Sequence, residues 1–331
     1  MTTETPVPAE VLSALQGYER ILLVSHLNPD GDATGSSLAL AWTLRALDKQ
    51  VLLYNANGFP GYLDFLPLPC PVLTDLAKLP CDPQLIVALD CGGILRPGEA
   101  VQPLLKRLPS VCIDHHLQSD KGFGSLANWV EPDRSSTGEM AALIARALGA
   151  PLQGALAEAL YVAISSDTGN FSFGNTTPTA LEIVSELAAN GLNIASVREK
   201  LENNWTEAKL RLWGRLMQEA RLLDEGRFAA SIVTPGMLSE CHAAREDTEG
   251  FVEHLRRLRG VRVALLLREE MQDGALKTKA SMRSSGNDDV GAVAARFGGG
   301  GHRNAAGATL AMDAESALTA LHPVIRSVWN G

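Results

Sequence analysis

Nearly continuous apolar runs recur along the first half of this chain, and they constrain its fold more than any other feature. They lie at residues 20–25, 51–56, 85–90 and 110–116, and helical-looking segments separate them, such as GSSLALAWTLRAL after the first. A strand that is apolar throughout is buried on both faces, and helices between such strands indicate a parallel sheet. We therefore expect an α/β fold, with a parallel sheet in its N-terminal part.

The pattern changes in the second half of the chain. Residues 178–225 look helical, and strand candidates follow at 227–234, 261–270 and 275–285. The last two candidates are joined by MQDG, which predicts a hairpin. One predicted helix carries an apolar stripe for packing on its neighbours, made of Leu210, Trp213, Met217 and Ala220.

The length of 331 residues favours two domains, each long enough to bury a core. We predict a catalytic domain over residues 1–190 and a helical linker over residues 191–226. A smaller α/β domain that binds substrate is expected over residues 227–331. The chain contains no internal repeat and no low-complexity tract.

The composition excludes several classes of protein. A formal net charge of −9 argues against a protein that coats nucleic acid through a basic surface. The five cysteines form no CxxC pair and are expected to be reduced core thiols. The first residues, MTTETPVPAE, lack the basic and apolar parts of a signal peptide, and no apolar run approaches about 20 residues. We expect a cytoplasmic protein that does not bind membranes.

Acidic and histidine side chains gather where the apolar runs end. A lone aspartate at the end of a strand is usually a helix cap or a turn residue. Four such places in one domain, at the carboxyl ends of strands where parallel sheets bind ligands, indicate a functional site instead. The candidates are His26, Asp30, Asp32, Asp90, Asp114, His115, His116 and Asp167.

Side chains that converge in this way would place four carboxylates beside two imidazoles, and the carboxylates would repel one another. Two divalent cations remove that repulsion, and a mixed nitrogen and oxygen ligand set favours Mn²⁺, with Mg²⁺ and Co²⁺ as the alternatives. The stretch DGDATG does not have the spacing of an EF-hand, and the chain has no phosphate-binding P-loop motif. A hydrolase that uses two metal ions is the remaining hypothesis.

Four ordered motifs in the first half resemble those of the DHH phosphoesterase superfamily: SHLNPDGDATGSS, ALDCGG, IDHH and ISSDTGNF. In the second half, KASMRSS and FGGGGHRNAAGA resemble the signature of the DHH-associated C-terminal domain. The combination is similar to the branch of small oligoribonucleases, or nano-RNases, that also dephosphorylate pAp. This resemblance implies a DHH catalytic domain, a DHH-associated substrate domain and an active site in the cleft between them.

The resemblance also implies a role for each candidate. One metal ion would be held by His26, Asp30 and Asp90, and the second by Asp32, Asp90, His115 and Asp167, with Asp90 bridging the two. His116 would lie near the scissile phosphate as a hydrogen-bond donor or acid. Asp114 would orient the histidine pair, although a set in which His116 itself binds metal stays open.

Substrate residues are expected mainly in the second domain. A run of glycines has no side chains, so its N–H groups can approach a phosphate closely. Arg283 can bind a phosphate through two parallel hydrogen bonds. In EPDRSSTGE, Arg134 and Ser136 are further candidates for phosphate contact, but Ser136 or Thr137 also fits a helix cap with Glu139 nearby. The predicted substrate-binding residues are Arg283, Gly299, Gly300, Gly301, His302, Arg134 and Ser136.

The function that the resemblance implies is hydrolysis of short oligoribonucleotides to mononucleotides, together with 3′-phosphatase activity on pAp. The alternative is a phosphodiesterase for linear or cyclic dinucleotides, such as pApA or cyclic di-AMP. Inorganic pyrophosphatase fits less well, because GGGGH stands where that branch has its own C-terminal pattern. Expected partners are short oligoribonucleotides and small phosphorylated nucleotides rather than long nucleic acid, and the sequence leaves open whether the chain forms a homodimer.

Overall fold

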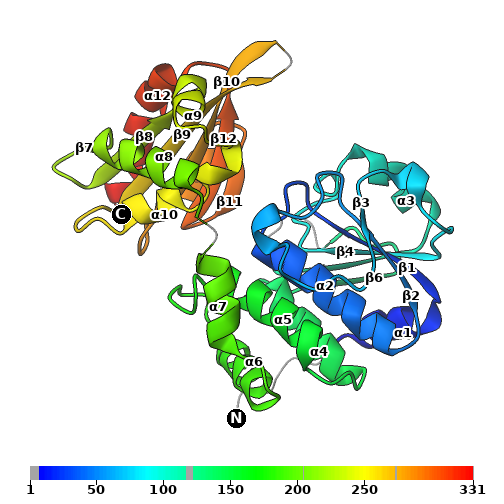
Figure 1. The fold of residues 1–331 in the computed structure, drawn as a ribbon. Helices are drawn as coiled ribbons and strands as arrows, with labels where there is room; N and C mark the ends of the chain where they lie inside the picture. The colour runs from blue at the N-terminus through cyan, green and yellow to red at the C-terminus, as the bar shows by residue number, and fades with distance from the viewer. Residues whose placement is uncertain (1–6, 117–121, 204, 273, 331) are drawn as a thin grey trace. The chain divides into compact units, whose positions relative to one another are not determined.

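The computed structural model describes residues 7–116, 122–203, 205–272 and 274–330. It divides the chain into two compact units, Met1–Asn204 and Trp205–Gly331 (Figure 1). Each unit contains a six-stranded sheet with buried apolar side chains on both faces. The α/β class predicted from the apolar runs is confirmed.

The sheet of the first unit has the order β3-β2-β1-β4-β5-β6, and every neighbouring pair is parallel, as predicted. Its central strands are the apolar runs that begin the chain, and they are buried along almost their whole length. The strands are β1 (Arg20–Ser25), β2 (Gln50–Tyr54), β3 (Val72–Leu73), β4 (Leu85–Leu89), β5 (Ser110–Asp114) and β6 (Ala127–Val130).

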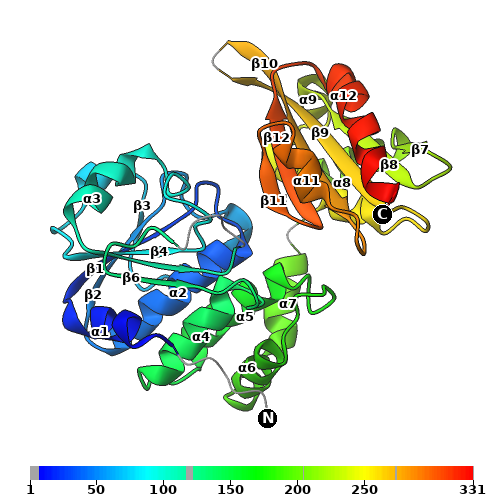
Figure 2. The ribbon, with the colours of Figure 1, turned by 180° about the vertical axis from the view of Figure 1, so that it is seen from behind.

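Alternate residues of each strand enter two different cores. In β1, Ile21 and Leu23 join one core, while Leu22 and Val24 join the other. Figures 1 and 2 show α2, α4 and α5 on one face of this sheet and α3 on the other. The helices are α1 (Ala9–Gly17), α2 (Gly31–Ala46), α3 (Gln102–Arg107), α4 (Thr137–Ala147), α5 (Gly154–Asp167), α6 (Pro178–Ala189) and α7 (Ile194–Glu202), and 3₁₀ turns lie at Gly61–Leu63, Leu76–Lys78 and Glu99–Val101.

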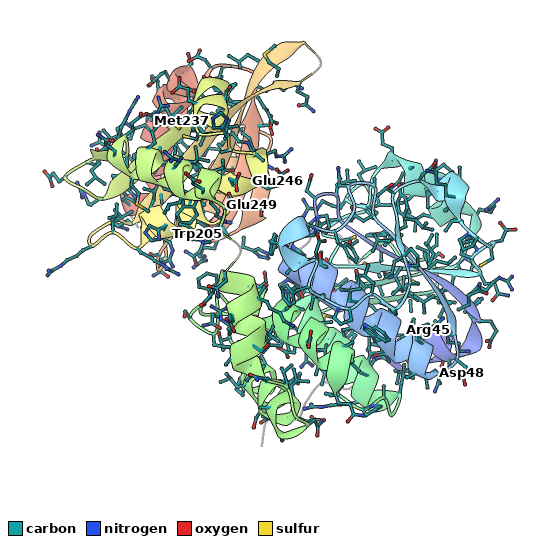
Figure 3. All side chains as sticks on the ribbon, viewed as in Figure 1. Arg45, Asp48, Trp205, Met237, Glu246 and Glu249 are labelled. Carbon is teal, nitrogen blue, oxygen red and sulfur yellow. The ribbon has the colours of Figure 1, made fainter. Side chains whose placement is uncertain are left out.

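Helix α2 leads directly away from the end of β1. Asp30 caps its first turn by accepting hydrogen bonds from the backbone N–H groups of Asp32 and Ala33, at 3.1 and 3.0 Å. Arg45 lies in its last turn, and Asp48 follows with a φ of 60°, at the far end of the helix from Asp30 (Figure 3). The cap therefore fixes Asp30 and Asp32 at one edge of the sheet.

The second unit has a mixed sheet of order β11-β12-β10-β9-β8-β7, in which only β8 and β9 are parallel. Strands β9 and β10 form the predicted hairpin, with Gln272 opposite Ala275. The strands are β7 (Arg221–Leu223), β8 (Phe228–Val233), β9 (Val263–Gln272), β10 (Ala275–Ser284), β11 (Gly300–His302) and β12 (Ala305–Leu310).

Helices cover both faces of the second sheet. In Figure 1, α8, α9 and α10 lie in front of it, and Figure 2 shows α11 and α12 on the other face. The helices are α8 (Glu207–Gln218), α9 (Pro235–Glu240), α10 (Phe251–Arg256), α11 (Val290–Ala295) and α12 (Ala314–Ser327), with 3₁₀ turns at Arg245–Thr248 and Val328–Asn330.

The apolar stripe predicted for the helix after residue 204 is wrong. Helix α8 buries Leu212, Trp213 and Leu216, whereas Leu210 and Met217 are 61% and 44% exposed. The buried side chains belong to a core of the second unit, while α7 packs in the first unit. The region expected as a linker, residues 191–226, is thus shared between the two units.

The cysteines and the helix lengths agree with the composition. All five cysteines are free thiols, and Cys91, Cys112 and Cys241 are buried. Burial raises the pKa of Cys112 to about 12, which makes this thiol unreactive. Among the helices of the described residues, none has both the length and the apolar character to cross a membrane.

Candidate metal centre

The six predicted metal ligands come together at the edge of the first sheet where β1, β4 and β5 end. His26 follows β1, and Asp30 and Asp32 stand at the start of α2. Asp90 follows β4 directly, and His115 follows β5. Each of these residues lies within the contact network described below, because parallel strands place their carboxyl ends at one edge.

Asp167 reaches the site from a different element than expected. The apolar run before it, LYVAISS, was taken for a strand, but it belongs to α5, of which Asp167 is the last residue. Nearly every residue of α5 from Leu156 to Ser165 is buried, so the helical period is hidden in the sequence. A carboxylate at the C-terminus of a helix is unfavourable by itself, and a nearby cation relieves it.

One ligand cluster contains His26, Asp30 and Asp90. The Nε2 atom of His26 lies 3.8 Å from Oδ1 of Asp30 and 3.6 Å from Oδ2 of Asp90. His26 and Asp90 are buried, while the side chain of Asp30 is 61% exposed. The cluster is therefore rigid on its inner side and open to solvent at Asp30.

A second cluster contains Asp32, His115 and Asp167. The Nε2 atom of His115 lies 3.7 Å from Oδ2 of Asp32 and 3.4 Å from Oδ2 of Asp167. It also lies 3.7 Å from Oδ1 of Asp90. Since the other carboxylate oxygen of Asp90 faces His26, Asp90 stands between the two clusters.

Backbone carbonyls fix the orientation of both histidines. Nδ1 of His26 donates to the carbonyl of Leu27 at 2.8 Å, and Nδ1 of His115 donates to the carbonyl of Arg134 at 3.3 Å. A carbonyl only accepts, so each Nδ1 carries the proton and each Nε2 presents a lone pair. This second contact is typical of histidines that bind metal.

The start of α4 holds two of the carboxylates, and sequence reasoning missed this contact. The N–H groups of Thr137 and Gly138 donate to the two oxygens of Asp32 at 2.7 and 2.8 Å. The hydroxyl of Thr137 donates to Oδ1 of Asp90 at 3.0 Å. The signal was present in SSTGE, which was interpreted only as a helix cap.

Asp90 has a left-handed backbone, with a φ of 57°. This conformation is rare for residues other than glycine, and it costs free energy unless the surroundings impose it. The N–H of Asp90 donates to the carbonyl of Ile113 at 3.0 Å, so β5 holds the bend. The strain is located at the residue shared by both clusters.

Without a cation, the carboxylates of the second cluster resist ionisation. Burial, followed by the charges of Asp90, Asp167 and Asp30, raises the pKa of Asp32 well above its usual range. Burial also raises the pKa of Asp167 to about 6, although the charge of His115 opposes the change. These shifts measure how strongly the cluster needs positive charge.

Histidine contacts act in the other direction on Asp90. Burial raises its pKa, but the contacts with His26 and the charges of His116 and His115 hold it below its usual range. Burial lowers the pKa of His26, yet Asp30 and Asp90 together raise it to about 10. In the absence of metal, a proton on His26 supplies part of the missing positive charge.

The donor set fits two divalent cations. The histidine nitrogens lie 3.4–3.8 Å from the carboxylate oxygens, which is longer than a hydrogen bond. Two atoms that each lie about 2.0–2.2 Å from one ion are roughly 3–4 Å apart, so the spacing suits ligands around a shared ion. Two divalent ions would also balance the four carboxylates of Asp30, Asp32, Asp90 and Asp167.

His116 lies beside this donor set and is held by Asp114. Its Nδ1 donates to Oδ1 of the fully buried Asp114 at 2.7 Å, and lies 3.5 Å from Oδ1 of Asp90. Burial lowers the pKa of His116, but the hydrogen bond to Asp114 and the charge of Asp90 raise it to about 9. The same atoms form a third group with His115, so this geometry leaves both predicted roles of His116 open.

Two of the predicted phosphate contacts have structural roles. Ser136 is fully buried and caps α4 by accepting a hydrogen bond from the N–H of Glu139 at 3.0 Å. The buried Arg134 guanidinium contacts Glu139 at 3.0 Å and Glu131 at 3.2 Å. The capping alternative therefore accounts for these two residues, and we do not propose either as a substrate contact.

Arg283 lies in the second unit on β10. Its Nε pairs with Oε1 of Glu253 at 2.7 Å, and its Nη1 donates to the carbonyl of Met282 at 3.0 Å. These contacts hold the guanidinium at the sheet, with the side chain 30% exposed. An arginine that is held in this way loses little entropy when it binds an anion.

The glycine run is part of the sheet rather than a flexible loop. Gly300 to His302 form β11, which pairs with β12. A Cβ atom at Gly299 would lie 2.1 Å from the carbonyl oxygen of Gly307. At Gly301, where φ is 138°, a Cβ would lie 2.5 Å from the carbonyl of Ala305. Close packing against β12 thus explains Gly299 and Gly301, while Gly300 and His302 are exposed.

Comparison with known proteins identifies the family. The chain matches the N-terminal domain of the DHH family over residues 20–164 and the DHHA1 domain over residues 233–327. It is 35% identical over 303 residues to a Thermus thermophilus protein named bifunctional oligoribonuclease and PAP phosphatase NrnA, covering 91% of this chain and 87% of that protein. The chain belongs to the DHH family. The resemblance carried by the ordered motifs is confirmed.

Other members of the DHH family match over similar lengths. A Bacillus subtilis protein with the same name is 28% identical over 308 residues, covering 91% of this chain and 92% of the relative. A crystal structure of an exopolyphosphatase-related protein from Bacteroides fragilis superposes with a TM-score of 0.87 at 27% identity, covering 98% of both chains. The DHH match contains five of the six candidate ligands, and Asp167 follows its last residue.

Proposed function

We propose that this chain is a metal-dependent phosphodiesterase that shortens oligoribonucleotides of a few residues to mononucleotides and removes the 3′-phosphate of pAp. The observation that carries the proposal is the pair of ligand clusters that share Asp90. The names of the Thermus thermophilus and Bacillus subtilis relatives support the choice of substrates.

His26, Asp30 and Asp90 would hold one ion, and Asp32, Asp90, His115 and Asp167 would hold the other. We propose Mn²⁺ for both, because imidazole and carboxylate ligands are mixed. When bound, such ions supply Lewis acidity toward a phosphate and lower the pKa of a water molecule. The protein fixes its ligands through Leu27, Arg134 and the start of α4.

His116 is proposed to contact the scissile phosphate and to donate a proton to the leaving oxygen. The contact with Asp114 places a proton on Nδ1 and raises the pKa of the ring to about 9, so the imidazolium predominates at neutral pH. Its Nε2–H is then the atom that donates. The half-buried position, 24% exposed, suits contact with both substrate and protein.

The second unit is proposed to bind the part of the substrate that does not react. Arg283 would hold a phosphate through the N–H groups that do not face Glu253. The exposed residues Gly300 and His302 of β11 would supply further contacts. A chain of net charge −9 lacks the extended cationic track that a long strand needs, which favours substrates of a few nucleotides.

The test is product release from a 5′-labelled RNA trimer and from pAp, with Mn²⁺ and with EDTA. A 24-mer, pApA, cyclic di-AMP and pyrophosphate serve as competing substrates, and H116A serves as the inactive control. We expect Mn²⁺-dependent cleavage of the trimer and of pAp, slow cleavage of the 24-mer, and loss of activity in H116A.

Other outcomes would change the assignment. Preference for pApA or cyclic di-AMP would assign the chain to dinucleotide turnover. Pyrophosphate hydrolysis alone would assign it to the pyrophosphatases. Absence of hydrolysis of every substrate, with folded protein and bound Mn²⁺, would contradict the proposal.

A further inference from the structure

The loop that follows Asp90 is attached to the metal centre at both ends. At its start, a Cβ on Gly92 would lie 3.6 Å from Cγ of His116, so the loop backbone passes beside that ring. Near its end, the carbonyl of Arg96 accepts a hydrogen bond from the N–H of Leu27 at 2.8 Å. Leu27 is the residue that accepts from Nδ1 of His26. The loop Cys91–Gly98 is therefore connected by direct contacts to a proposed ligand of one ion and to His116.

Arg96 brings a positive charge to this acidic region without neutralising it. Its side chain is exposed, and among the residues that the structure describes its guanidinium forms no hydrogen bond or ion pair. By contrast, Arg134 in the same unit is held by two carboxylates. A guanidinium beside the metal ligands that is not committed to a protein carboxylate is available to an anionic group of a substrate.

The same loop presents apolar side chains to solvent. Ile94 and Leu95 are 47% and 70% exposed, and Leu27 beside them is 38% exposed. Their closeness follows from the backbone bond between Leu27 and Arg96 and from contact between Leu27 and Gly98, where an added Cβ would lie 3.1 Å from Leu27 Cδ2. Exposed leucines that gather beside a catalytic centre are typical of a ligand surface, whereas scattered ones need no explanation.

We propose that the loop Cys91–Gly98 is a nucleotide-binding platform, on which Arg96 binds a phosphate oxygen and Leu95, with Leu27 and Ile94, packs against the attached nucleobase. A cation next to an apolar surface matches a nucleotide, which carries its anionic phosphate and its flat base side by side. The identity of the bound nucleotide as substrate or product rests on the proposed function. The contact is sequence-independent, since every base has an apolar face.

Binding of AMP and of ribose 5-phosphate, measured by calorimetry with Mn²⁺, tests the platform without turnover. We expect R96Q to weaken both ligands about 10-fold, because a charge-assisted hydrogen bond to phosphate is lost. R96K should recover part of this affinity. L95S should weaken AMP about 5-fold and leave ribose 5-phosphate unchanged, because only AMP carries a base.

Matched controls are available in the same unit. R107Q removes an exposed arginine from α3, which precedes β5 and so lies toward the opposite edge of the sheet. L181S replaces a leucine that is 50% exposed on α6. Both controls should bind the two ligands like the unmodified protein, and all four exposed substitutions should leave the thermal midpoint nearly unchanged.

The outcomes separate this inference from the proposed function. Equal affinities in R96Q and R107Q, or equal weakening of both ligands by L95S, would overturn the platform. A change of oligomeric state in L95S with unchanged AMP affinity would overturn it in favour of a contact between copies of the chain. If the unmodified protein binds AMP through these residues but does not cleave the RNA trimer, the platform stands and the proposed function fails.

Discussion

The two units present their candidate functional residues in opposite ways. In the first unit, His26, Asp32, Asp90 and His115 are at most 6% exposed, and backbone groups fix each of them or its neighbour. In the second unit, Gly300 to His302 lie exposed on β11 at the edge of the sheet. Metal ligands must keep fixed distances to an ion, whereas substrate contacts must stay accessible to a molecule that arrives and leaves.

The largest expected effect comes from the residue that both clusters share. D90N keeps the size of the side chain but removes one ligand charge from each proposed ion site. We expect kcat/KM for the RNA trimer to fall at least about 1,000-fold, since several kcal/mol of charge stabilisation are lost. D82N, an exposed aspartate just before β4, is the control and should keep full activity. Activity of D90N within 10-fold of the unmodified protein would contradict the shared role.

An intermediate effect is expected from Arg283, on the accessible side of the comparison. R283Q should lower kcat/KM for the trimer about 10- to 100-fold, mainly through KM, because it removes a charged contact to a phosphate that does not react. Steady-state kinetics measure the two constants separately. The control is R257Q, an exposed arginine directly after α10. A fall in kcat alone would place Arg283 at the reacting phosphate instead.

A smaller effect should follow from loosening the rigid unit without removing a ligand. T137V deletes the hydroxyl that donates to Asp90 and keeps the N–H that donates to Asp32. We expect about 10-fold more Mn²⁺ to be needed for half-maximal activity, with activity restored at saturating Mn²⁺. T43V alters a buried threonine that bonds within α2 and should not change the Mn²⁺ requirement. Loss of activity that Mn²⁺ does not restore would contradict a positioning role for Thr137.

The smallest effect is expected where the sequence suggested a substrate contact and the structure gives a cap. S136A removes the N-cap of α4 and should lower the free energy of unfolding by about 1 kcal/mol, as read from urea denaturation. Because Ser136 is fully buried, KM for the trimer should stay within about 2-fold. A large rise in KM with unchanged stability would restore Ser136 as a phosphate contact.

Much of the first unit could be predicted because its signals are local. Each apolar run is a single strand, and the positions of His26, Asp90 and His115 after these runs follow from strand ends. Asp167 reached the site from a helix whose buried faces conceal its period. The contact of Thr137 with Asp32 and Asp90 joins residues far apart in the chain, so no local pattern carries it.

The second unit was less predictable because packing between elements decides its details. The stripe on α8 could not be assigned from hydrophobicity alone, since the helix has apolar residues on more than one face. The glycine run reads as a flexible loop or an anion site, but the close approach of β12 to Gly299 and Gly301 appears only in three dimensions. Its residues therefore serve the sheet as well as any ligand.

The central claim is that two metal ions share Asp90, and the most direct test is electron paramagnetic resonance of the protein titrated with Mn²⁺. The account predicts two Mn²⁺ ions per chain and a spin-coupled signal, because one carboxylate bridges the pair. In D90N the coupled signal should disappear. Binding of a single Mn²⁺ ion, or of two ions without coupling in the unmodified protein, would contradict the account.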